Sequence, residues 1–426
     1  MKPLVCFYFQ VHQPYRLRDL RITEIGQGEP QYFDQHKNHA VFRKVAEKCY
    51  LPANRLMLEL LQRQRNFSIA YSLSGVFLEQ CEEYGQDVLD SFKALAATGR
   101  VEFLAETYYH SLSYLKSLEE FCFQVNAHTE KIQKLFGQTP RIFRNTELIY
   151  CNELAHVVRL LGYKGILAEG ADHILQGRSP NEPFIPPTFR LPRSKEQIIR
   201  NHRIHPGRSE QISVLLKNYR LSDDVAFRFS DRSWIGYPLH ADTFTDWLMS
   251  SGGHSINLFM DYETFGEHQW ADTGIFEFLR ALPRIWQERG ILCATPSEVI
   301  EAWKTKNQKL KTKNYQRDEI FDAHSFISWA DLERDLSAWQ GNHIQHAALE
   351  ALYALEDLIK QSGSKELLTI WRRLQTSDHF YYMSTKYWSD GDVHKYFSPY
   401  DSPYEAYRRF SHALCDLKDR LEKLTS

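Results

Sequence analysis

The sequence has no apolar run long enough to cross a bilayer and no excess of charge of either sign. Its 426 residues carry 52 Lys and Arg against 54 Asp and Glu, which gives a formal net charge of −2. A near-neutral chain has no long-range field to draw it to nucleic acid or to an anionic membrane. The sequence therefore predicts neither of these partners, and it leaves the oligomeric state open.

Cysteine is sparse, and its spacing forms no recognisable pairs. The seven cysteines are scattered along the chain, and none belongs to a Cys-x-x-Cys motif. An odd, dispersed set is typical of reduced, buried thiols and not of a disulfide framework or a zinc ribbon. The residues after Met1 also lack the cleavage pattern of a signal peptide. We therefore expect a cytoplasmic location.

The common nucleotide and esterase motifs are missing as well. No G-x-G-x-x-G follows the first apolar run, and the chain has no P-loop and no G-x-S-x-G. Aromatic residues, in contrast, make up 14% of the chain. Because Trp and Tyr combine a flat apolar face with a polar tip, they suit sugar binding as well as a large core. Composition alone leaves both uses open for any single aromatic residue.

Short apolar runs alternate with helical periodicity through the first two thirds of the chain. We expect strands at 4–11, 67–73, 101–104, 141–143, 165–168, 212–216 and 255–260. Strands that alternate with helices indicate an α/β fold with a parallel sheet. Seven such strands can close into a barrel or form an open doubly wound sheet, and the pattern does not decide between the two.

Three further stretches set the organisation of the rest of the chain. Residues 178–208 are rich in Pro and Arg and predict a long surface excursion, and 304–317 predict a solvated linker or helix end. Helical periodicity then returns at 331–359, 364–374 and 404–424. We therefore predict a β/α domain at 1–303 and a helical subdomain at 304–426.

Polar side chains crowd the ends of five predicted strands. They include His12, Gln13, Glu102, Glu106, His110, Glu147, Glu169, Asp172, His173, Asp261, Glu263, Glu267 and His268. The carboxyl ends of parallel strands meet at one edge of a sheet, so we expect a pocket there. Glu147 and Asp261 each follow a different strand, as glycosidic cleavage requires of its acid and its second carboxylate. By position alone, either residue could instead cap a helix or form a salt bridge.

Histidines at the strand ends allow a rival interpretation, which is a metal site for hydrolysis. The candidate ligands are His12, His110, His173, His240 and Asp261. No pair of them has the short spacing of H-x-H or H-E-x-x-H. We therefore predict no metal and no cofactor, and a metal-dependent polysaccharide hydrolase or deacetylase remains an alternative.

Five sequence blocks occur in an order that is typical of one family. They are HQP, GRVEFLAETYYHS, FRNTELIY, MDYETFGEHQ and SWADLERDLSAWQGN. Together with the tail KYWSDGDVHKYFSPYDSPYEAY, they resemble glycoside hydrolase family 57, and most closely its α-amylase-type members. The resemblance implies an incomplete seven-stranded β/α barrel followed by a C-terminal helical bundle that completes the cleft. It also implies a retaining mechanism on α-1,4-linked glucans without an obligatory metal.

The matching blocks imply roles for individual residues. Glu147 would be the nucleophile and Asp261 the general acid/base. The residues expected to bind substrate are His12, Gln13, Glu102, His110, Glu263, Trp270, Asp335 and Trp339. Among these, His12 and His110 are expected to donate to sugar hydroxyls. Trp270, together with Trp234 and Trp329, is a candidate stacking platform, and each of the three could equally belong to the core.

The charges near the two carboxylates agree with these roles. Arg144 could favour the anionic form of Glu147, while Glu263 and Glu267 would raise the pKa of Asp261. A retaining mechanism requires the two carboxyl groups to lie about 5–5.5 Å apart. The expected function is therefore a retaining α-glucan hydrolase. A 4-α-glucanotransferase or branching enzyme would use the same site, and a non-catalytic glucan-binding protein is a further alternative.

Overall fold

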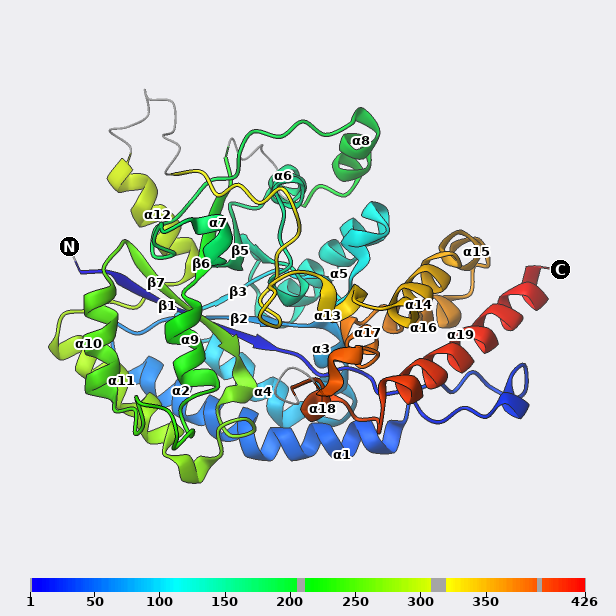
Figure 1. Cartoon of the computed structure of the whole chain (residues 1–426), viewed down its shortest axis with the longest axis horizontal. Helices are drawn as coiled ribbons and strands as arrows, with labels where there is room; N and C mark the ends of the chain where they lie inside the picture. Colours follow the sequence, from blue (N-terminus) through cyan, green and yellow to red (C-terminus); the bar gives the residue numbers. More distant parts are fainter. Residues whose placement is uncertain (1, 205–210, 308–318, 389–392, 426) are drawn as a thin grey trace.

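Seven parallel strands form the centre of the molecule (Figure 1). The computed structural model describes residues 2–204, 211–307, 319–388 and 393–425. The strands are β1 (Leu4–Val11), β2 (Ile69–Leu73), β3 (Val101–Phe103), β4 (Ile142–Arg144), β5 (Gly165–Glu169), β6 (Ser213–Lys217) and β7 (Ser255–Asp261). One sheet has the order β3-β2-β1-β7 and the other the order β4-β5-β6. The predicted α/β fold with parallel strands is thus confirmed.

Hydrogen bonds join the two sheets at both edges. Beyond β3, the backbone N–H of Ala105 donates to Ile142 at 2.9 Å, and Arg144 donates back to Ala105 at 2.8 Å. Between β6 and β7, the backbone N–H of Asn218 donates to Asn257 at 2.9 Å. The side-chain amide of Asn257 donates to the carbonyl of Leu216, also at 2.9 Å. The second junction therefore uses an asparagine side chain and a loop instead of a strand ladder.

Alternate residues of the strands share one interior cluster. Because neighbouring residues of a strand point to opposite faces, each strand contributes to two cores. The interior cluster draws on both sheets and contains Cys6, Tyr8, Ala70, Leu104, Ile142, Leu167, Leu215 and Phe259. The opposite face of β1 carries Phe7 and Phe9, which pack under helices. The two sheets therefore enclose a common apolar interior.

Helices cover the outer faces of the strands (Figure 1). They are α1 (Gln35–Val45), α2 (Leu51–Arg63), α3 (Gly75–Tyr84), α4 (Gln86–Ala96), α5 (Leu118–Phe136), α6 (Asn152–Leu161), α7 (Asp172–Leu175), α8 (Arg193–Asn201), α9 (Tyr219–Ala226), α10 (Ala241–Ser251), α11 (Ile275–Glu288) and α12 (Pro296–Asn307). Local sequence signals set the ends of α5. Ser117 accepts a hydrogen bond from the backbone of Glu120, and Gly137 closes the helix with a φ of 71°. Within the described residues, no helix is long and apolar enough to span a membrane.

The predicted surface excursion at 178–208 is more firmly attached than expected. Phe184 and Ile199 are buried, and Phe184 forms an antiparallel bridge with Val214 of β6. Apolar residues between the polar ones explain the difference, because their burial anchors the segment. The last residues of this segment, 205–208, lie outside the described residues. Of the linker predicted at 304–317, the first four residues belong to α12, and 308–317 lie outside the described residues.

A second group of helices packs beside the strands (Figure 1). It comprises α13 (Ser337–Gln340), α14 (His343–Tyr353), α15 (Glu356–Gln361), α16 (Lys365–Arg373), α17 (Ser377–Tyr381), α18 (Val393–Phe397) and α19 (Pro403–Thr425). Their apolar faces share a core with Tyr15, Leu17 and Tyr109 from the first part of the chain. The buried carboxylate of Glu120 on α5 accepts a 2.8 Å hydrogen bond from Arg372 on α16. Packing therefore crosses the predicted boundary at 303/304.

Candidate active site

Glu147 lies in a single 3₁₀ turn, Thr146–Leu148, directly after β4. Its φ of 56° and that of Leu148, 50°, fall in the left-handed region that residues with a β-carbon seldom adopt. Backbone conformations of this kind cluster at functional sites, because the surrounding structure must stabilise them. Here the backbone N–H of Trp329 donates to the carbonyl of Glu147 at 3.3 Å and helps to hold the turn.

Both carboxylate oxygens of Glu147 accept hydrogen bonds. Nε2 of His110 lies 3.0 Å from Oε1, and the indole N–H of Trp329 donates to Oε2 at 2.6 Å. Burial opposes the charged form, but the hydrogen bond and charge of His110, the charge of Arg144 and the Trp329 hydrogen bond together lower the pKa of Glu147. Glu147 is therefore held as an anion, as the sequence predicts with Arg144.

His110 links Glu147 to a second carboxylate, Glu106. Nδ1 of His110 lies 2.9 Å from Glu106, which is fully buried and also accepts from Gln10 at 3.3 Å. Burial acts against the cation, yet its two carboxylate partners raise the pKa of His110 to about 9. Burial likewise opposes the anion of Glu106, but the hydrogen bond from His110 lowers its pKa to about 2. His110 is therefore a cation between two anions at neutral pH.

His12 stacks on His110, with their ring centroids 4.1 Å apart. Its Nε2 lies 2.9 Å from Asp378 of α17, and its Nδ1 lies 2.7 Å from the hydroxyl of Ser74. Burial and then the positive charge of His110 lower the pKa of His12. A neutral imidazole is thus stacked on a charged one, and Asp378 orients it from the C-terminal helices.

Asp261 is the last residue of β7 and is paired in register with Gln10 of β1. Burial and then the negative charge of Glu147 raise the pKa of Asp261 to about 6, although Arg144 and Lys217 act in the opposite direction. The charge of Glu147 therefore adds to burial in favouring the protonated form of Asp261. A neutral acid beside an ionised carboxylate is the arrangement in which two carboxyl groups take different catalytic roles.

Glu263 lies two residues beyond Asp261 and accepts a hydrogen bond from the hydroxyl of Tyr50. Gln13 donates to the same hydroxyl at 3.1 Å. Burial and then the charge of Asp261 raise the pKa of Glu263 to about 8. Glu267 instead pairs with Lys44 at 2.5 Å. The largest charge effect on Asp261 therefore comes from Glu147, and not from Glu263 or Glu267 as expected.

Two cations lie against the indole ring of Trp329. The guanidinium carbon of Arg144 is 4.9 Å from the ring centroid, and the ammonium nitrogen of Lys217 is 5.4 Å from it. Lys217 also pairs with Asp223 at 2.9 Å and lies 3.8 Å from Glu169. The indole that donates to Glu147 is thus held in a fixed position by cations from β4 and β6.

The structure does not bring four of the predicted substrate-binding residues into this cluster. Glu102 accepts a hydrogen bond from the backbone of Ser297 at the start of α12 and lines a cavity of about 730 Å³, to which the segments that precede β2, β3 and β4 contribute. It therefore lies at the opposite end of the strands, and Glu106, four residues later, occupies the site. Trp339 is 1% exposed and belongs to the core of the C-terminal helices.

Asp335 and Trp270 are found on the surface. The exposed carboxylate of Asp335 accepts from the backbone of Ser337 at 2.8 Å. Its carbonyl accepts from Ser328 at 2.8 Å, so Asp335 supports the loop that carries Trp329. Trp270 is 59% exposed and packs beside Lys48, a placement that is compatible with stacking on a sugar.

Sequence reasoning missed three contributions to the site. Glu106 stands in one of the polar strand ends, but nothing in the sequence distinguishes it from Glu102. Trp329 was predicted as a stacking platform, and its hydrogen bond to Glu147 depends on the tertiary structure. Asp378 gives no local signal, because it lies 366 positions from its partner His12.

The candidate ligands of the alternative metal site are not assembled into a metal centre in the described part of the chain. There, no group of three or more His, Cys, Asp or Glu side chains is arranged to hold an ion. His12 and His110 use their ring nitrogens for the hydrogen bonds described above. His173 and His240 are exposed.

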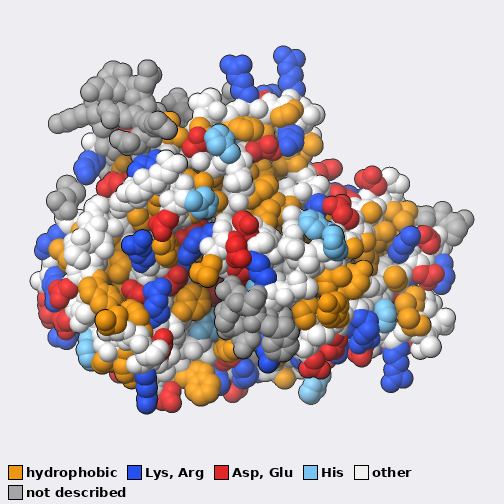
Figure 2. Space-filling view, viewed as in Figure 1, with side chains coloured by type: hydrophobic (Ala, Val, Ile, Leu, Met, Phe, Trp, Pro, Cys, Tyr) orange, Lys and Arg blue, Asp and Glu red, His pale blue; other side chains and the backbone are white. Residues whose placement is uncertain are grey.

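Charge on the surface is mixed in sign. Figure 2 shows Lys and Arg side chains interspersed with Asp and Glu over the drawn face. A chain with a net charge of −2 and this distribution has no broad cationic surface in this view. Nothing here favours nucleic acid as a partner.

The chain matches one family model and has a relative that is similar over almost the whole chain. Residues 6–315 match the family model described as Glycosyl hydrolase family 57. A protein of Methanocaldococcus jannaschii named "Putative alpha-amylase" is 42% identical over 437 residues, which cover 99% of this chain and 85% of the relative.

Two solved structures share the fold. A branching enzyme from Thermococcus kodakaraensis has a TM-score of 0.63 at 13% identity, covering 100% of this chain and 92% of that one. A 4-α-glucanotransferase from Thermococcus litoralis has a TM-score of 0.54 at 17% identity over 93% of this chain. This chain spans only 54% of the length of the transferase.

Proposed function

The chain belongs to glycosyl hydrolase family 57 and is a glycoside hydrolase, and from this we propose that it is a retaining α-amylase-type enzyme that cleaves α-1,4-glucosidic bonds. One observation carries the proposal. Burial, and then the charge of an ionised Glu147, raise the pKa of Asp261 to about 6, so that one carboxyl group is charged while the other can carry a proton. Neither carboxylate needs a cofactor for this division of roles.

In the proposed first step, Glu147 attacks the anomeric carbon. The glycosidic bond breaks as its oxygen takes the proton of Asp261, and a glycosyl ester forms on Glu147. His110 and Trp329 keep the attacking carboxylate oriented through its two oxygens. The same two hydrogen bonds stabilise the negative charge of Glu147. His110 and Trp329 are therefore positioning residues, which keep Glu147 ionised while moderating its strength as a nucleophile.

In the second step, Asp261 removes a proton from water, and the water oxygen displaces Glu147 from the sugar. Formation of the ester removes the negative charge of Glu147, which is the largest charge effect that raises the pKa of Asp261. The pKa of Asp261 therefore falls in the intermediate, and the former acid becomes the anion that a general base must be.

We also propose that the seven strands form an incomplete β/α barrel and that residues 304–426 complete the site. The interior cluster shared by both sheets supports the barrel. Trp329 and Asp378, which contact Glu147 and His12, support the role of the C-terminal region. The substrate would be an α-glucan or a maltooligosaccharide.

Glu147→Gln tests the mechanism, with Glu102→Gln as a matched control at the other end of the strands. We expect Glu147→Gln to lower kcat on maltotetraose by about three orders of magnitude or more, because no glycosyl ester can form. Glu102→Gln should stay close to wild type. If folded Glu147→Gln kept more than about a tenth of the wild-type kcat, the nucleophile assignment would be wrong.

Transfer to a second sugar is the second candidate function, because the solved structures that share this fold include a branching enzyme and a 4-α-glucanotransferase. The chemistry differs only in whether water or a sugar hydroxyl reaches the intermediate. Products of maltotetraose separate the two. Hydrolysis gives only shorter sugars and, under retention, an α-anomer first by NMR, whereas transfer also gives longer ones.

A further inference from the structure

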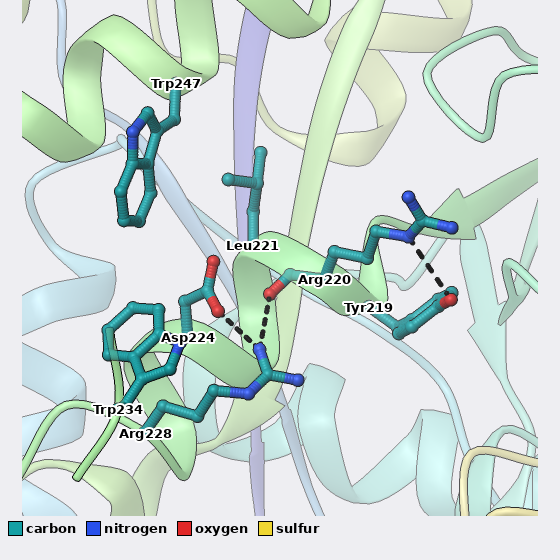
Figure 3. Close-up of a pocket in the computed structure, with 7 residues that line it drawn as sticks. All are labelled: Tyr219, Arg220, Leu221, Asp224, Arg228, Trp234 and Trp247. Atoms are coloured by element: carbon teal, nitrogen blue, oxygen red, sulfur yellow. Dashed lines mark hydrogen bonds and ion pairs between the residues drawn. The ribbon is translucent and has the colours of Figure 1, made fainter. Parts of the chain in front are cut away.

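A pocket of about 590 Å³ lies on the outer side of α9. It is open to solvent, and the residues that line it are Tyr219, Arg220, Leu221, Asp224 and Arg228 from α9 and its end, Trp234 from the next loop and Trp247 from α10 (Figure 3). It contains neither Glu147 nor Asp261.

The two tryptophans of this pocket differ from the buried Trp286 and Trp371. Both are half-buried, and their rings pack edge to face with centroids 5.9 Å apart. Among the described residues, neither indole N–H donates a hydrogen bond to a protein group, whereas the buried Trp286 and Trp371 donate to Thr245 and Leu352. The pocket thus offers aromatic surface together with two available donors, which is the combination that tryptophan brings to a wet binding surface.

Trp234 is held in place by its own loop. Its backbone N–H donates to Asp231 at 3.2 Å, and its carbonyl accepts from Tyr237 at 2.9 Å. A side chain at Gly236 would come within 2.6 Å of the indole ring, so the ring lies directly against that backbone. A fixed aromatic surface loses little conformational freedom when a ligand binds.

Polar groups lie on the other side of the pocket. Arg228 pairs with Asp224 and donates to the carbonyl of Arg220 at 3.5 Å, and its side chain is 40% exposed. A guanidinium and a carboxylate provide donors and acceptors at once. Neighbouring hydroxyl groups on a sugar ring present the same mixture, while the ring faces are apolar.

The pocket is also connected to the catalytic site through one side chain. The guanidinium carbon of Arg334 lies 4.2 Å from the centroid of the Tyr219 ring. Arg334 also pairs with Glu169 at 2.8 Å. Arg334 belongs to the same loop as Trp329, which donates to Glu147. One edge of the pocket, at Tyr219, therefore lies next to the loop that carries Trp329.

We propose that this pocket is a second, non-catalytic binding site for a polymeric α-glucan, with Trp234 and Trp247 as its sugar platforms and Arg228 as its polar contact. The identity of the ligand as a glucan depends on the proposed function. The site would raise the affinity for long chains such as glycogen and amylopectin without taking part in bond cleavage.

Affinity electrophoresis in native gels that contain glycogen tests the proposal, because retardation measures binding to the polymer and not its cleavage. The protein should be retarded, and Trp234→Ala combined with Trp247→Ala should weaken glycogen binding by about tenfold, as expected for two lost aromatic contacts. Tyr404→Ala, which removes an exposed aromatic residue from α19, is the matched control and should migrate like the parent. If an alanine variant fails to fold, Trp234→Phe and Trp247→Phe take its place. These variants keep an aromatic ring and should retain most of the glycogen binding.

Turnover of maltotetraose separates this proposal from the proposed function. The double alanine variant should keep the parent's kcat on maltotetraose and show a higher KM on glycogen. Equal retardation of the folded double variant and the parent would overturn the second site, whatever the activity. Absence of any glucan turnover by the parent would overturn the proposed function alone, provided that glycogen retardation still depended on the two tryptophans.

Discussion

Trp329→Phe isolates the hydrogen bond that reaches Oε2 of Glu147. The indole N–H lies 2.6 Å from that oxygen, and phenylalanine keeps an aromatic ring between Arg144 and Lys217 while removing the donor. A hydrogen bond to a charged group contributes about 1.5–3 kcal/mol. One pKa unit corresponds to about 1.4 kcal/mol, so complete loss would raise the pKa of Glu147 by about one to two units.

Partial replacement by water reduces this effect. The side chain of Glu147 is 23% exposed, so a water molecule can take over part of the lost contact. We therefore expect a shift of about one unit. The direction of the pH shift follows from the effect of this hydrogen bond in the folded protein. The hydrogen bond lowers the pKa of Glu147, and the nucleophile must be ionised, so its loss moves the acidic limb of activity to higher pH.

The assay is kcat/KM for maltotriose from about pH 3 to about pH 8, because this parameter reports the free enzyme's groups. The acidic limb should move upward by about one unit, while the alkaline limb, set by Asp261 near pH 6, should stay in place. Trp270→Phe is the control, since it changes a surface indole and should leave both limbs unmoved. An unchanged acidic limb in folded Trp329→Phe would refute the role given to this hydrogen bond.

Three further predictions concern the acid, the metal and the packing of the C-terminal helices. Asp261→Asn should abolish the alkaline limb near pH 6 and lower kcat on maltotriose by about two to four orders of magnitude. The rate of the first step on an aryl glucoside with a good leaving group should fall much less, because that leaving group does not need a proton. Equal losses on the two substrates would exclude the acid role. Dialysis against a strong chelator should leave activity unchanged, and a loss restored by zinc or calcium would favour a metal-dependent hydrolase. Arg372→Ala should lower the free energy of unfolding by about 2 kcal/mol in urea titrations, because the buried Glu120 carboxylate then keeps only Gln124 at 3.1 Å and Lys360 at 3.8 Å as side-chain partners in the described residues. An unchanged midpoint would contradict that account.

Periodicity alone located the strands well. Runs such as 165–168 and 255–260 correspond to β5 and β7, because strands of a parallel sheet are buried on both faces and must be continuously apolar. The start of α13 was less predictable. Helical periodicity was expected from residue 331, yet 331–336 form a loop in which Asp331 and Arg334 have positive φ values. Contacts with distant residues, such as Asp331 with His394 and Arg334 with Glu169, favour that loop over a helix.

The sequence by itself determined which chemistry is present at the strand ends, including Glu147, Asp261 and His110, because residue type and position after an apolar run are local properties. Only the tertiary structure decided how these groups act on one another. The charge on Glu147 depends on His110, Arg144 and Trp329, and that of Asp261 depends on Glu147. The tertiary structure also separated Glu102 from Glu106. Glu102 lies toward the amino end of β3, and Glu106, four residues later, lies beyond the other end of that strand. Burial and Coulomb interactions depend on distances through space, and no spacing along the chain records them.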